Sequence, residues 1–176
     1  MARAKSAPVP TRTSTRNSAT CIGTIRGATG APLAPTRIAH IESKGLGVVA
    51  DADLQEGALV GVYTGRVLVP RRPGYASHYC LQTTALLDGQ TVDVLIDPST
   101  SDRVAEEFKR DPACRVNEPA IGERANCAYV ACAPAILEGG VSVANVEVRT
   151  ICPVRAGDEL LTLYGPHVPA RAYSCA

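Results

Sequence analysis

Tyr164 lies near the end of a short apolar stretch, residues 158–165, which runs Asp-Glu-Leu-Leu-Thr-Leu-Tyr-Gly. The turn-forming sequence Arg-Ala-Gly-Asp leads into it and Gly165 with Pro166 stops it, so the pattern predicts a buried strand between two turns. A tyrosine at the end of such a strand has its ring in the core and its hydroxyl where the strand meets solvent or a pocket. This placement suits a reactive group.

Two other segments carry residues that could build a site around this tyrosine. Residues 44–47, Lys-Gly-Leu-Gly, place glycines between two expected strands, and glycine lets a backbone pass close to a ligand. They are not a dinucleotide fingerprint, because a strand follows and the third glycine is missing; a tight hairpin turn is the alternative. Asn117 and Asn126 lie in a loop with Pro and Gly, where their side chains can support irregular backbone. An ordinary surface loop is the alternative there.

The elements that would position these residues are mostly short β-strands. Apolar and β-branched segments alternate with turn residues about every ten positions, and one helix is expected over residues 101–110, with Val104 and Phe108 on its apolar face. This pattern predicts a small, mostly β domain. The expected strands cover residues 37–42, 46–50, 58–63, 66–69, 77–82, 92–97, 126–131, 141–150 and 159–164.

The composition indicates one domain with an aliphatic core. Trp is absent and Phe108 is the only phenylalanine, so Val, Leu, Ile, Ala and six tyrosines must fill the interior of this 176-residue chain. Seven cysteines, an odd number, without a signal peptide indicate free thiols in a reducing compartment. Cys127 lies in the strand expected at 126–131 and Cys132 directly follows it, and at this spacing their side chains point to opposite faces, so we expect no metal site. No apolar run reaches membrane-spanning length, and no membrane partner is expected.

Charge divides the chain into a basic N-terminus and an acidic body. Residues 1–41 contain six Lys or Arg and no acid, which leaves 12 basic and 17 acidic residues, a net charge of −5, for residues 42–176. An acidic body favours basic partners, although an ordinary solvated surface explains the charge equally well. Residues 1–21 are expected to be a disordered tail. A transit peptide and a nucleic-acid-binding arm are the alternatives, and the tail is the only part expected to contact nucleic acid.

These motifs occur in one order: Lys-Gly-x-Gly, Glu-Gly-x-x-Val-x-x-Tyr-x-Gly, a tyrosine-containing strand, an Asn loop, and Ala-Gly-Asp-Glu-Leu-x-x-x-Tyr-Gly. From about residue 37 to residue 168 this order resembles the SET domain of protein lysine methyltransferases. The cysteine-rich modules that flank many members are absent, so the chain is similar to small stand-alone viral and microbial SET proteins. The implied domain covers residues 36–168, after a Gly/Pro-rich transition (22–35) and before an extension (169–176).

The resemblance implies a β-clip fold of several small sheets, with few short helices and a knot-like C-terminal arrangement in which the Asn117 loop passes beneath residues 159–164. It implies S-adenosylmethionine as the cofactor. It assigns Tyr63 to the lysine channel and Tyr164 to the active-site tyrosine. The implied cofactor-binding residues are Lys44, Gly45, Leu46, Gly47, Tyr79, Asn117 and Glu118.

The chain departs from the family pattern at several of these positions. Glu118 and Pro119 stand where the family has His and Ser, and Leu163 and Arg66 stand where it usually has acids. Thr162 stands where the family often has an aromatic residue, and a smaller side chain there implies a wider pocket and higher methylation states.

Three functions are therefore weighed. The first is an S-adenosylmethionine-dependent protein-lysine methyltransferase acting on a histone or another basic protein, which a histone substrate would place in the nucleus. The second is a SET-like module that has lost catalysis and binds basic peptides or chromatin. The third is an unrelated β domain whose glycines and asparagines only form turns. Retention of Tyr63 and Tyr164 favours the first over the second.

Overall fold

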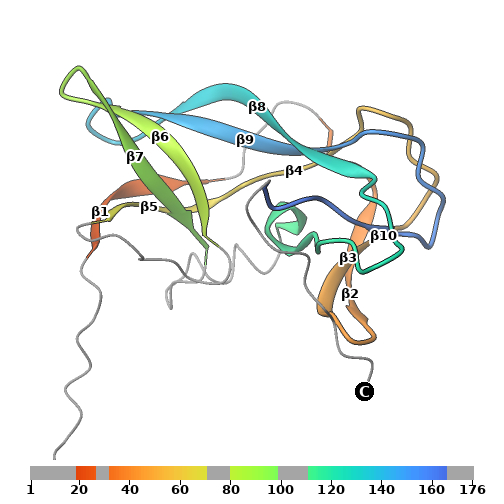
Figure 1. Ribbon diagram of the computed structural model, residues 1–176. Helices are drawn as coiled ribbons and strands as arrows, with labels where there is room; N and C mark the ends of the chain where they lie inside the picture. Colours follow the sequence, from red (N-terminus) through yellow and green to blue (C-terminus); the bar gives the residue numbers. More distant parts are fainter. Residues whose placement is uncertain (1–18, 27–31, 71–79, 99–110, 166–176) are drawn as a thin grey trace, which may run out of the picture.

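The computed structural model describes residues 19–26, 32–70, 80–98 and 111–165 (Figure 1). Within these ranges the chain forms ten strands, arranged in two antiparallel sheets, and one 3-10 helix. The elements are β1 (Ala19–Ile25), β2 (Thr36–Ile41), β3 (Gly45–Ala50), β4 (Leu59–Val62), β5 (Gly65–Pro70), β6 (Leu81–Leu87), β7 (Gln90–Asp97), η1 (Pro112–Arg115), β8 (Cys127–Ile136), β9 (Ser142–Thr150) and β10 (Glu159–Leu160).

The larger sheet has the strand order β1-β5-β7-β6-β9-β4, and β8 pairs with β9 off this path. Two hairpins supply most of it: β6–β7, which turns through Asp88 and Gly89, and β8–β9, the long ribbon across the top of Figure 1. Both Asp88 and Gly89 have positive φ, which is the conformation that a two-residue hairpin turn requires.

The smaller sheet has the order β10-β3-β2 and lies at the other end of the molecule (Figure 1). The β2–β3 hairpin turns at Ser43 and Lys44, as the Gly-containing sequence predicts, with Ile41 opposite Gly45. β10 pairs with β3 through Glu159 and Leu160, which are opposite Val49 and Val48. The smaller sheet therefore brings residues 44–47 close to the start of the stretch that ends in Tyr164.

Two aliphatic cores fill the molecule, as the composition predicts. One lies under the larger sheet and contains Val67, Ile96, Val143 and Tyr63. The other lies between the two sheets. It contains Val48, Val60, Ala113, Val116, Val148 and Leu160.

The C-terminal stretch passes through the Asn117 loop, which gives the knot-like arrangement that the resemblance implies. On one side, the amide of Thr162 donates to the carbonyl of Asn117 at 2.9 Å. On the other side, the amides of Asn126 and Cys127 donate to the carbonyl of Leu161 at 3.0 and 2.9 Å. These bonds form two isolated parallel β-bridges, one between Asn117 and Leu161 and one between Cys127 and Thr162. Leu161 and Thr162, shortly before Tyr164 in the chain, are thus held between the two ends of the loop 117–127.

Most of the expected strands are recovered with shifted ends, apart from four differences. β6 lies C-terminal to the strand expected at 77–82, and β8 extends to Ile136 instead of ending at 131. Only Glu159 and Leu160 of the expected strand 159–164 join a sheet, because the next two residues bond to the Asn117 loop instead. β1 begins at Ala19, inside the range expected to be tail. The helix expected over 101–110, most of the N-terminal tail and the extension 169–176 lie outside the described residues.

Candidate functional site

The site centres on three tyrosines from three distant parts of the chain. Tyr63 follows β4 and is buried, and its ring packs edge-on against Tyr129 of β8, with centroids 6.2 Å apart and an interplanar angle of 73°. Burial raises the pKa of the Tyr63 hydroxyl, and the neighbouring Cys114, Tyr129 and Tyr164 raise it further. Burial likewise raises the pKa of Tyr129, again with Tyr164 and Cys114 nearby. Tyr63 and Tyr129 therefore share one environment, with Tyr164 beside them, in which their uncharged hydroxyls are favoured.

Tyr164 is fixed at both its side chain and its backbone. Its hydroxyl donates to the carbonyl of Val116 at 2.8 Å, and its amide donates to Oε1 of Glu118 at 3.1 Å. Val116 is fully buried and Glu118 is 5% exposed, so both partners lie in the interior. The two bonds reach the residues on either side of Asn117, which ties the tyrosine to the Asn loop.

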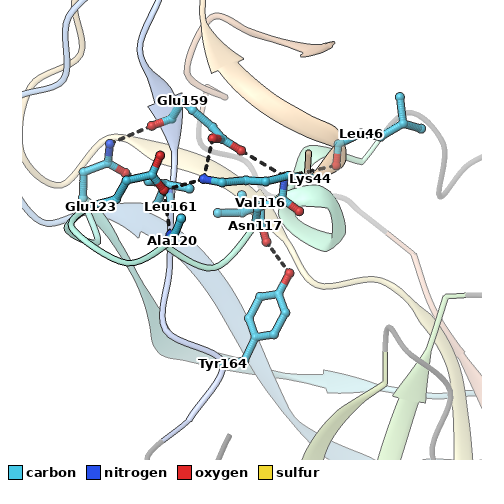
Figure 2. A network of polar contacts seen from close by, with 10 residues as sticks. Lys44, Leu46, Val116, Asn117, Ala120, Glu123, Glu159, Leu161 and Tyr164 are labelled. Atoms are coloured by element: carbon cyan, nitrogen blue, oxygen red, sulfur yellow. Dashed lines mark hydrogen bonds and ion pairs between the residues drawn. The ribbon is translucent and has the colours of Figure 1, made fainter. Parts of the chain in front are cut away.

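A network of charged and amide groups lies on the other side of the Val116–Asn117 backbone (Figure 2). The Asn117 amide nitrogen donates to Oε1 of Glu159 at 2.9 Å and to the carbonyl of Leu46 at 3.3 Å. The Lys44 ammonium pairs with Oε2 of Glu159 at 2.9 Å and with Glu123. This network joins the β2–β3 hairpin, the Asn loop and β10 at one point.

Lys44 is the centre of this network, and its side chain is only 4% exposed. Burial opposes the charge of the ammonium, but the hydrogen bonds and charges of Glu123 and Glu159 outweigh it, so the pKa of Lys44 lies above its ordinary value. The Lys44 bond in turn lowers the pKa of Glu123, a surface residue. Because both glutamates hold the ammonium, the side chain of Lys44 serves to fix the turn that it belongs to.

The two glycines of the turn differ in their surroundings. A Cβ on Gly47 would lie 2.6 Å from Ile41, 2.7 Å from the Asn117 amide and 2.8 Å from Glu159, so any side chain would displace the network. Gly45 has φ +84° and no atom near the position of a Cβ. Gly47 is therefore required by the close approach of Asn117, whereas Gly45 leaves its backbone open.

The structure brings most of the predicted site residues together. Lys44, Leu46 and Gly47 meet Asn117 in the polar network, and Gly45 lies in the same turn. Glu118, in place of the family's His, contacts the backbone of Tyr164. Tyr63 and Tyr164 share the tyrosine cluster. Tyr79 lies outside the described residues.

Two contributors were missed by sequence reasoning, Tyr129 and Glu159, whereas the support of irregular backbone by the Asn126 side chain was predicted and is confirmed. The side chain of Asn126 donates to the carbonyl of Glu159 and accepts from the amide of Leu161, both at 2.8 Å, so it acts like a strand partner. Tyr129 could have been predicted from its position two residues after Cys127, because residues at this spacing place their side chains on the same face of a strand. No local signal marks Glu159, since its partners lie far away in sequence.

The described cysteines are free thiols, and in that part of the chain no three His, Cys, Asp or Glu side chains gather in a way that could hold a metal ion. Burial raises the pKa of Cys127 to about 12, with Cys152 adding to the effect, so this thiol stays protonated at neutral pH. Among the same residues, no helix has the length and apolar character needed to cross a membrane.

The two sheets, the threaded C-terminal stretch and the tyrosine cluster define a SET-domain fold, and comparison with solved structures agrees. The chain is similar to the SET domain of ATXR5 in complex with histone H3 dimethylated on arginine 26, with a TM-score of 0.55 and 17% identity over 80% of this chain. A second ATXR5 structure, with histone H3.1 monomethylated at the same arginine, gives 0.54 and 16% over 80%.

The match spans about three fifths of these solved chains, 62% and 61% respectively. No protein-family model matches the sequence, and no curated protein matches it. At this level of identity the likeness establishes the fold, and the chemistry must be argued from the residues of this chain.

Proposed function

We propose that this chain is a protein-lysine N-methyltransferase that uses S-adenosylmethionine. The observation that carries the proposal is the position of Tyr164. Its hydroxyl and amide are bonded to Val116 and Glu118, on either side of Asn117, between the Tyr63–Tyr129 pair and a glycine turn fixed by polar side chains. A phenol between a tyrosine cluster and a polar turn suits a reaction in which an amine from one side meets a cofactor from the other.

The tyrosines would bind and orient the substrate amine. A lysine must lose its proton before it can be methylated, and an apolar surrounding lowers the pKa of an amine by desolvation. Tyr63 and Tyr129 supply that surrounding, and their own raised pKa values keep them uncharged, so they do not compete as nucleophiles. Holding the amine in line with the group it attacks supplies most of the rate in such a reaction.

The polar side of the site fits a zwitterionic cofactor. S-Adenosylmethionine, when bound, supplies an activated methyl group with a thioether as its leaving group. The turn at Gly45 offers open backbone, and Asn117 and Glu118 lie between that turn and Tyr164. We assign cofactor binding to Lys44, Gly45, Leu46, Gly47, Asn117 and Glu118, with Lys44 acting by fixing the turn. Tyr79 stays in this assignment on the sequence resemblance alone.

The proposed substrate is a lysine in a basic segment of a protein such as a histone. The charge of the chain beyond its N-terminus supports this, since residues 42–176 carry a net charge of −5. The solved structures that share the fold contain histone H3, which agrees with the same class of substrate. Thr162, which is buried beside the loop, supports a pocket wide enough for more than one methyl group.

The test has two parts. A calorimetric titration of the full chain with S-adenosylmethionine should show saturable binding, and a methylation assay on histones and nucleosomes with mass-spectrometric readout should show added methyl groups on lysine. No cofactor binding at high micromolar concentration would overturn the proposal.

A binding module without catalysis is the second candidate, because Glu118 replaces the family's His and two acids are lost. It is supported if basic peptides bind while S-adenosylmethionine does not. The methyltransferase is favoured because both tyrosines that the chemistry needs are present and lie in one cluster.

A further inference from the structure

The short helix η1 connects the two hydrophobic cores. Ala113 packs into the core between the sheets, and the next residue, Cys114, packs into the core under the larger sheet. The helix contacts β4 of the larger sheet and both β2 and β3 of the smaller one, and Figure 1 shows its short coil between the two ends of the molecule. A displacement of η1 would therefore change the packing of both cores and of the strands from both sheets that η1 contacts.

Asp111 fixes the start of this helix with both carboxylate oxygens. Oδ1 accepts from the amide of Ala113 at 3.0 Å and so caps η1, while Oδ2 accepts from the hydroxyl of Thr64 at 2.7 Å. Thr64 follows Tyr63 directly, and its carbonyl accepts from the thiol of Cys114 at 3.7 Å. The helix is therefore bonded to the backbone that carries Tyr63.

The end of the same helix reaches Tyr164. Val116 follows η1 directly, and its carbonyl accepts the hydroxyl of Tyr164. Only the four residues of η1 thus separate Asp111, the anchor beside Tyr63, from Val116, the acceptor of Tyr164. A change at one end of this segment is transmitted over a single helical turn to the other.

A carboxylate is a costly choice for this cap. Burial raises the pKa of Asp111, and the bonds from Thr64 and Ala113 oppose that rise. Space is also reserved for it, since a Cβ on Gly61 would lie 2.9 Å from Oδ1. A serine would cap the helix without this cost, but a single hydroxyl could not bond to η1 and to Thr64 as two separate oxygens do.

We propose that Asp111 is a positioning residue for methyl transfer, which through η1 sets the placement of Tyr63 relative to Tyr164. The inference rests on the proposed function for its reaction, but the connection between the two tyrosines is a property of the fold. The proposal predicts that removing the hydrogen bond from Thr64 to Asp111 changes the rate of methyl transfer more than it changes the affinity for the cofactor.

The kinetic test compares Thr64→Val, which keeps the shape and loses the hydroxyl, with Thr64→Ser, which keeps the hydroxyl. Since small misplacements of reacting groups are costly, we expect Thr64→Val to lower kcat about tenfold with little change in the KM for cofactor. We expect Thr64→Ser to stay near wild type. Asp111→Asn, whose amide can still bond to both partners, should also keep most of kcat. An unchanged kcat in Thr64→Val, or equal losses in all three variants, would overturn the proposal.

A spectroscopic test works even if the chain transfers no methyl group. Tyrosines labelled with ¹³C at the ring are assigned with Tyr63→Phe and Tyr164→Phe, and their NMR signals are compared between wild type, Thr64→Val and Thr64→Ser. If η1 connects the two sites, Thr64→Val shifts the signals of both tyrosines and Thr64→Ser shifts neither appreciably. A Tyr164 signal that stays in place in Thr64→Val would show that Asp111 acts on its own surroundings only.

Discussion

The two sides of the candidate site meet at Val116–Glu118 but are built from opposite chemistry. On one side the buried Tyr63 and the half-buried Tyr129 and Tyr164 form a cluster of phenols with no charged side chain among them. On the other side a lysine, two glutamates and an asparagine are bonded to one another around a glycine turn (Figure 2). The uncharged side suits the reacting amine, and the charged side suits binding. The comparison therefore predicts that mutations on the two sides change different kinetic constants.

The largest effect is expected for Tyr164→Phe. The change removes one hydroxyl and its bond to Val116, so the fold should remain while methyl transfer falls about 100-fold, the usual cost of losing one preorganised hydrogen-bonding group. Cofactor affinity should change little. Initial rates on a histone substrate and calorimetry with S-adenosylmethionine measure the two quantities, and Ile136→Ala, at an exposed position of β8, serves as a control. Weakened cofactor binding with an unchanged rate would reverse the assignment of the two sides.

Asn117→Ala tests the charged side. The substitution removes the hydrogen bonds to Leu46 and to the Glu159 carboxylate, which frees the glycine turn. We expect the dissociation constant for S-adenosylmethionine to rise about tenfold or more, because a bond to a charged group contributes about 1.5–3 kcal/mol. Turnover at saturating cofactor should fall less than in Tyr164→Phe. Equal affinity in the variant and the wild type would move the cofactor site away from this loop.

A third prediction compares the two glutamates that hold Lys44. The side chain of Glu159 is 14% exposed and that of Glu123 is 42% exposed, so the same ammonium has one part-buried and one exposed partner. We expect Glu159→Gln to lower the free energy of unfolding by about 2 kcal/mol, and Glu123→Gln by about 0.5 kcal/mol or less.

Denaturant titrations at low and high salt measure both changes. Only the loss in Glu123→Gln should shrink as salt increases, because a surface pair is screened and a buried one is not. Similar losses in the two variants at every salt concentration would mean that the two ion pairs of Lys44 contribute equally and that Glu159 is as accessible to solvent as Glu123.

The sequence predicted the elements better than their partners. The hairpin at residues 44–45 and most strands follow from local pattern, because glycine turns and aliphatic runs act within a few residues. The β6–β7 turn was not predicted, although Asp88-Gly89 is a strong hairpin signal, because the strand before it was expected at 77–82 and is observed at Leu81–Leu87.

The site could be predicted only in part, for a physical reason. Residues proposed to contact the ligand have characteristic types within the motifs that resemble a SET domain, and Tyr63, Asn117 and Tyr164 were predicted in this way. Residues that hold them in place are chosen by long-range packing: Glu159 lies 115 positions from Lys44, and its bond leaves no periodic trace in the sequence. The β-strand pattern even favoured continuing β10 through Thr162, where the chain instead bonds to the Asn117 loop.

The smallest expected effect is a plateau in the pH dependence of the uncharged side. Burial raises the pKa of Tyr63 and Tyr129 above the ordinary value of 10.0, so both hydroxyls stay protonated through the alkaline range. The rate should therefore rise as the substrate amine loses its proton and then level off, without a decline up to about pH 9.5. Initial rates between neutral pH and that limit, in wild type and in Tyr63→Phe, provide the measurement. A decline in the wild type that Tyr63→Phe removes would mean that Tyr63 ionises in this range, and that the cluster is open to water rather than closed around the amine.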